Sequence, residues 1–125
     1  MALTARHPTI VGNRSFRNIL LYGAGTRCTL FLRQRSHRYP KINDDRCIVG
    51  LLDDDPNLHG RMVYGFKVMG GVSQLTAILT KRNISDIIIT TDLQDDVRRQ
   101  LLDIAKERHV RVAEWRTEER TLSPA

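Results

Sequence analysis

The stretch ILLYGAGTRC, residues 19–28, decides the fold of this 125-residue chain. A short apolar run ends at Gly23, and a helical pattern begins at Thr26. This is the profile of a buried parallel strand that turns directly into a helix. Gly23 permits the tight turn, and Gly25 lets the backbone approach a phosphate group without a Cβ in the way. The first N–H groups of the helix would then face an anion, which the helix dipole also favours.

The same alternation of strand and helix continues along the chain. Apolar runs predict further strands over 47–52, 66–69, 86–91 and 110–114, and helical patterns cover 26–35, 73–82 and 94–108. Ser73 is expected to cap the second helix. This alternation predicts a Rossmann-like three-layer α/β domain, because it produces a parallel sheet with right-handed crossovers. We expect about five strands in the order 3-2-1-4-5.

The chain divides into one domain and two tails. Residues 1–16 are predicted to be a basic tail or linker, residues 17–115 the nucleotide-binding domain, and residues 116–125 a polar C-terminal tail. The net charge is +6, and residues 1–52 hold nine Lys/Arg against two acidic residues. A basic half suits a phosphate ligand, nucleic acid or an anionic membrane surface, and a plain solvated face explains it equally well.

Composition argues against several classes of protein. The longest apolar runs have strand length, far below the roughly 18 residues that cross a bilayer, and the N-terminus has no signal-peptide core. We therefore expect a cytoplasmic domain. Cys28 and Cys47 lack CxxC spacing, and the four histidines show no ligand spacing, so neither a disulfide framework nor a metal site is expected.

Polar residues follow the predicted strands at the sheet edge where open α/β domains bind ligands. Asp53 stands where a dinucleotide-binding domain places an acid on the ribose hydroxyls, and its charge would favour NAD-like over NADP-like ligands. A simple turn is the alternative explanation for this acid-rich stretch. The predicted cofactor contacts are Gly23, Ala24, Gly25, Thr26, Arg27, Asp53, Asp54 and Thr90.

No catalytic residue is predicted. No tyrosine is followed four residues later by lysine, so the Tyr/Lys relay of the short-chain dehydrogenases is absent, and neither GxSxG nor a Walker GK[ST] motif occurs. The chain is therefore not expected to be an enzyme by itself. Cys28 occupies the third glycine position of GxGxxG, which puts the phosphate geometry in question.

The stretches ILLYGAGTR, VGLLDDDPNLHGRMVYGFKVMGG, DIIITT and VRVAEW resemble a known family. They look like the Rossmann-like CoA-binding or nucleotide-binding domain of bacterial polysaccharide-biosynthesis proteins. That group includes the nucleoside-diphosphate-sugar epimerases and dehydratases and the domain fused to polyprenyl-phosphate sugar-phosphate transferases. The resemblance implies a non-catalytic module for capsule or O-antigen sugar synthesis, within a larger protein at the cytoplasmic face of the inner membrane.

The resemblance favours NAD(H) as the ligand, with CoA or a UDP-sugar as alternatives. A partner would be a sugar-biosynthesis enzyme, a membrane-anchored parent chain or a second copy of this chain. Two other functions stay open: part of an epimerase or dehydratase whose catalytic residues lie in another domain, and a structural or oligomerising domain with a decayed pocket. Nucleic acid is not expected as a partner, because no helix-turn-helix segment precedes the sheet.

Overall fold

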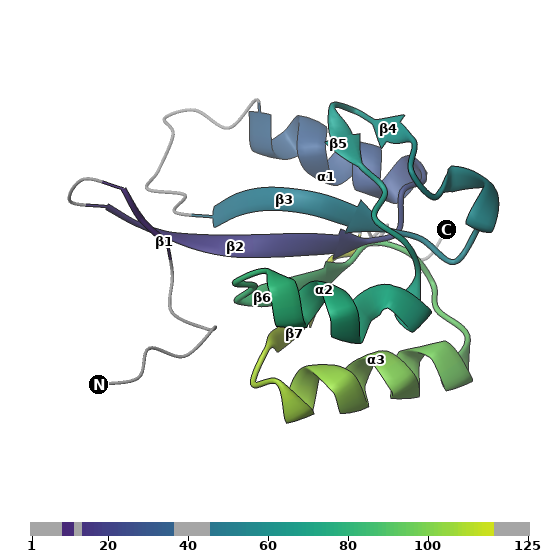
Figure 1. Ribbon diagram of the computed structural model, residues 1–125. Helices are drawn as coiled ribbons and strands as arrows, with labels where there is room; N and C mark the ends of the chain where they lie inside the picture. Colours follow the sequence, from purple (N-terminus) through teal and green to yellow (C-terminus); the bar gives the residue numbers. More distant parts are fainter. Residues whose placement is uncertain (1–8, 12–13, 37–45, 117–125) are drawn as a thin grey trace, which may run out of the picture.

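The computed structural model describes residues 9–11, 14–36 and 46–116, and all statements below concern these ranges. Strands and helices alternate as the sequence predicts (Figure 1). In the described part of the chain, no helix is long and apolar enough to cross a membrane. The elements are β1 (Thr9–Val11), β2 (Arg14–Tyr22), α1 (Thr26–Ser36), β3 (Arg46–Leu52), η1 (Pro56–Leu58), β4 (Met62–Val63), β5 (Phe66–Lys67), η2 (Val72–Gln74), α2 (Leu75–Lys81), β6 (Asp86–Ile89), α3 (Asp95–Glu107) and β7 (Arg111–Glu114).

The central strand of the sheet is β2. It pairs in parallel with β3 on one side and with β6 on the other, and β7 pairs in parallel with β6. Val68 adds one parallel bridge to Leu51 at the outer edge of β3. The predicted α/β class and the strand order 3-2-1-4-5 are therefore confirmed. In the labels used here that order is β5 with Val68, then β3, β2, β6 and β7, and the strand predicted over 66–69 is reduced to the short β5 and the single bridge at Val68.

The helices cover the two faces of the sheet, and the alternation of side chains along β2 separates two cores. Helix α1 lies on one face, and α2 and α3 lie together on the other (Figure 1). Leu20 and Tyr22 point into the core beneath α2 and α3, whereas Ile19 and Leu21 point into the core beneath α1. The three layers meet the expectation for a Rossmann-like domain.

Several predicted boundaries are wrong in detail. Strand β2 begins at Arg14 and pairs in antiparallel fashion with β1, so strands form within the segment predicted as a tail. Ser73 does not cap a helix: it lies inside η2, whose cap is Gly71, and α2 follows with Gln74 as its cap. The early start of β2 is explained by its pairing with β1, because strand pairing cannot be read from a single sequence.

The amino-terminal end of the sheet is closed by a buried carboxylate. Asp86 is the first residue of β6, and its side chain is only 2% exposed. Arg17 donates to both of its oxygens, at 2.6 and 2.5 Å, and Arg111 donates at 3.0 Å. A buried carboxylate is tolerated only when charged donors surround it, so these arginines tie β2 and β7 to β6.

We expect Asp86→Ala to lower the free energy of unfolding by roughly 2–4 kcal/mol, because it removes three charge-assisted hydrogen bonds and leaves two arginines without their acceptor. Urea denaturation measures the change. Asp103→Ala is the matched control: Asp103 is exposed on α3, and its loss should change stability by less than about 0.5 kcal/mol. Equal effects of the two substitutions would contradict this account of the sheet end.

A second prediction concerns Cys28, which is fully buried in the core beneath α1. Burial raises the pKa of its thiol to about 11, so the unfolded chain releases this proton at lower pH than the native one. The thiol's contribution to stability is then complete below about pH 9 and is lost as the pH rises towards 11. Denaturation of the native protein and Cys28→Ala over this range should show a stability difference that shrinks with pH; a constant difference would contradict the burial.

Candidate functional site

The turn between β2 and α1 is held by the two strands that flank β2. Gly23 has φ +118°, its N–H donates to the Leu52 carbonyl at 2.6 Å, and the Thr90 hydroxyl donates to the Gly23 carbonyl at 3.0 Å. A Cβ atom on Gly23 would lie 2.8 Å from the Cβ of Thr91. Both the backbone conformation and the packing therefore require glycine here.

Gly25, unlike Gly23, has room for a side chain. A Cβ atom at this position would have no neighbour within 4 Å in the part of the chain that the structure describes, and the residue is exposed just before α1 begins. No acidic residue lies in the first turn of α1, so its N–H groups face no anion from their own helix. The missing side chain at Gly25 thus leaves bare backbone at the positive end of an eleven-residue helix.

A cavity of about 360 Å³ opens in front of this bare backbone. We call it the α1 cavity. Its lining combines the start of α1 with the loop that follows β6, and it offers hydroxyls, one guanidinium and one carboxylate. The lining residues are Gly25, Thr26, Arg27, Leu30, Thr90, Thr91 and Asp92.

Asp53, the predicted ribose ligand, is used by the protein's own backbone. One of its carboxylate oxygens accepts from the Ala24 N–H at 2.8 Å, and the other accepts from the Asp55 N–H at 2.9 Å. Its carbonyl lies 2.7 Å from His59 Nε2. Asp53 therefore fixes the glycine turn from the end of the neighbouring strand.

Asp54, the next residue, faces the other way. Its Oδ1 accepts a hydrogen bond from the buried Tyr22 hydroxyl at 2.5 Å. Burial, and then the hydrogen bond to Asp54, raise the pKa of Tyr22 well above its usual value. The phenol therefore stays protonated and positions one oxygen of Asp54.

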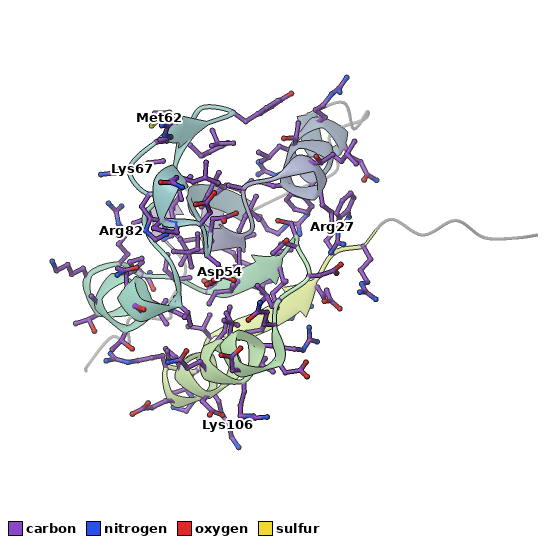
Figure 2. The ribbon with its side chains drawn as sticks, turned by 90° about the vertical axis from the view of Figure 1, so that its right-hand side faces the viewer. Arg27, Asp54, Met62, Lys67, Arg82 and Lys106 are labelled. Atoms are coloured by element: carbon purple, nitrogen blue, oxygen red, sulfur yellow. The ribbon has the colours of Figure 1, made fainter. Side chains whose placement is uncertain are left out.

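Asp54 lines a second cavity of about 610 Å³, which we call the η2 cavity. Polar groups of three loops and three apolar side chains surround it. Asp92 lines both cavities, so they adjoin at this residue. In Figure 2, Arg27 lies by α1 and Asp54 closer to the centre of the same edge. The lining residues are Asp54, Pro56, His59, Gly71, Val72, Ser73, Gln74, Asp92, Gln94 and Val97.

The structure thus divides the eight predicted contacts into two groups. Five of them line the cavities: Gly25, Thr26, Arg27 and the buried Thr90 the first, and Asp54 the second. Those beneath build the turn: Gly23, Ala24 and Asp53. Sequence reasoning missed His59, Gln74 and Gln94 as lining residues. Asp92 had a signal, its place directly after the strand at 86–91, but it was not among the eight chosen contacts.

Comparison with known proteins gives the fold and no closer relationship. No protein-family model matches the chain, and no curated protein sequence matches it. Among solved structures, a Rex-family repressor named RSP superposes with a TM-score of 0.64 at 16% identity, over 86% of this chain and 49% of the repressor chain. UDP-D-quinovosamine 4-dehydrogenase from Vibrio fischeri superposes with a TM-score of 0.59 at 20% identity, over 78% of this chain and 76% of that one.

A third structure corrects one expectation. RSP solved with β-NAD⁺ and operator DNA superposes with a TM-score of 0.57 at 19% identity, over 80% of this chain and 43% of that chain. The expectation that nucleic acid is not a partner is contradicted by this complex. That expectation rested on the absence of a helix-turn-helix segment, whereas this chain covers only about half the length of the repressor.

The identities are all 20% or lower, so the similarity establishes the fold alone. The chain has a Rossmann-like fold of the kind found in an NAD-binding repressor and in a nucleotide-sugar dehydrogenase.

Proposed function

We propose that this chain binds a nucleotide at the carboxyl edge of its sheet, with NAD(H) as the favoured ligand. The observation that carries the proposal is the contrast between the two glycines. Gly23 is required by the turn, whereas none of the described residues comes within 4 Å of a Cβ placed on Gly25. A glycine that packing does not need, placed before a helix N-terminus, is explained by a phosphate group that approaches the backbone.

The two cavities fit the parts of such a ligand. The α1 cavity offers the helix N-terminus, Arg27 and the Thr26 hydroxyl, which suit phosphate oxygens. The η2 cavity offers the carboxylate of Asp54 beside apolar side chains, which suits a nucleoside with free ribose hydroxyls. Both volumes lie within the range of about 300–1,000 Å³ that is usual for small-molecule sites. When bound, NAD(H) would supply hydride chemistry or a redox signal.

Nucleotide sugars are a second candidate ligand. The resemblance to polysaccharide-biosynthesis domains and the structural similarity to UDP-D-quinovosamine 4-dehydrogenase both favour them. In this case the chain would serve a sugar-modifying partner as a non-catalytic module. A panel of NAD⁺, NADH, NADP⁺, CoA, UDP-N-acetylglucosamine and ATP in thermal-shift and calorimetric titrations separates these ligands, since each stabilises the native state only if it binds there.

Gly25→Val should abolish the binding of the ligand found in this panel while the protein stays folded. The new side chain would occupy the space next to the α1 N-terminus, but its Cβ meets no atom of residues 9–11, 14–36 or 46–116 within 4 Å. The substitution should lower the free energy of unfolding by no more than about 1 kcal/mol, because valine is a poorer residue than glycine at the start of a helix. Isothermal titration calorimetry together with urea denaturation measures both properties.

Gly23→Ala is the matched control, because the same turn is altered without filling the cavity. It should lower the free energy of unfolding by roughly 2–4 kcal/mol, since the positive φ and the 2.8 Å contact with Thr91 both oppose a side chain. If Gly25→Val binds the ligand as tightly as the native protein, the nucleotide does not use this turn. If no ligand in the panel binds, a structural role for the domain replaces the proposed function.

The three consecutive acids 53–55 give a second test. Asp54→Asn should weaken NAD⁺ binding about tenfold, because a charge-assisted hydrogen bond to the ribose is lost. NADP⁺ should lose less, since its 2′-phosphate no longer meets a negative charge. Asp55→Asn is the control: Asp55 caps η1 through the Asn57 N–H and lines neither cavity. Calorimetric titration with both dinucleotides measures the ratio; an unchanged ratio in Asp54→Asn would remove Asp54 from the site.

A further inference from the structure

Arg27 is the cation of the α1 cavity, and it is already engaged. Its side chain is 25% exposed, and its Nη2 donates to Asp92 Oδ1 at 3.1 Å. Its other terminal nitrogen, Nη1, is buried and has no hydrogen-bond partner among the described residues. The guanidinium is therefore held by a single carboxylate oxygen, although its planar shape allows two parallel bonds to an oxyanion.

Asp92 is accessible to solvent, with 73% of its side chain exposed. It lies in the lining of both cavities. The hydrogen bond from Arg27, together with its charge, lowers the pKa of Asp92, so the carboxylate is ionised at neutral pH. A phosphate group that enters the α1 cavity would thus be attracted by the N-terminus of α1. Arg27, the cation that could bind this phosphate, would however already be paired with the Asp92 carboxylate.

Asp92 also has a second cationic neighbour. Arg116, just beyond β7, lies 3.4 Å from the same Oδ1 through its Nη2 and is 52% exposed. Because of this neighbour, Asp92 can release Arg27 without becoming an isolated charge. Arg116 is itself paired with Glu114 at 3.7 Å, so these two side chains form a charged pair beside Asp92.

We propose that Asp92 is a built-in competitor for the phosphate at Arg27, and that it sets both the affinity and the charge selectivity of the site. This inference rests on the proposed nucleotide binding. Binding then requires Arg27 to exchange a carboxylate for a phosphate oxygen, while Asp92 keeps Arg116. Only an anion with more charge than a carboxylate gains from that exchange, so the site should discriminate in favour of diphosphates against singly charged anions.

The experiment measures the affinity of inorganic pyrophosphate and of NAD⁺ by calorimetry at one fixed ionic strength. Asp92→Asn should bind pyrophosphate roughly three- to fivefold more tightly than the native protein, because an exposed ion pair contributes a factor of this order. Acetate binding should become detectable in the same variant. Arg27→Met should weaken pyrophosphate binding, and adding Asp92→Asn to Arg27→Met should restore little of it.

Two controls separate competition at Arg27 from a general change in charge. Glu114→Gln removes a carboxylate that contacts Arg116 and Arg98, whereas Arg27 pairs with Asp92, so it should leave the affinity within about twofold. A gain from Asp92→Asn that persists in the Arg27→Met background would overturn the proposal, since Arg27 would then not mediate it. Equal affinities of the native protein and Asp92→Asn would overturn it while leaving nucleotide binding intact. Absence of binding in every variant would instead reject the proposed function and this inference with it.

Discussion

The structure depends on the turn at Gly23, where three neighbouring strands end together. The Gly23 N–H is bonded to the end of β3, its carbonyl is bonded to Thr90 after β6, and the Ala24 N–H is bonded to the carboxylate of Asp53. Each bond joins the central strand to a flanking one, so the strand order and the start of α1 are fixed by the same few contacts. These contacts satisfy the backbone of the turn from the side of the sheet, whereas Thr26 and Arg27, the first residues of α1, line the α1 cavity.

The two ends of β6 show how burial decides the role of a carboxylate. Asp86, at its start, is 2% exposed and is enclosed by two arginines from β2 and β7, which makes it part of the framework. Asp92, just after its end, is also near two arginines, yet it is 73% exposed and can exchange partners with solvent or ligand. Both carboxylates pair with two arginines, but the free energy needed to break the pairs differs. It is much higher for Asp86, because a buried charge that loses its partner has no access to water.

The sequence predicted the parts of this molecule that depend on local pattern. The strand–Gly23–helix transition, the apolar runs of β3 and β6, and the amphipathic α3 each carry a period or a turn residue that acts within a few positions. The pairing of β1 with β2 escaped prediction because it involves no apolar period, only backbone hydrogen bonds between short segments. The lining residues Gln74 and Gln94 escaped for a different reason: a glutamine in a loop has no distinguishing pattern, and its place in a cavity arises from where two crossovers meet.

The acids after β3 show why the site was predicted only in outline. Asp53 occupies the position that a dinucleotide-binding domain gives to its ribose ligand, but both of its carboxylate oxygens accept from backbone N–H groups. Those bonds occupy an acceptor position on each oxygen that a ribose hydroxyl would otherwise use. Asp54 instead keeps one oxygen clear of Tyr22 and lines the η2 cavity. The η2 cavity thus presents a carboxylate, and the α1 cavity presents a guanidinium beside a helix N-terminus. The proposed nucleotide, with hydroxyls at one end and negative charge at the other, would need this arrangement.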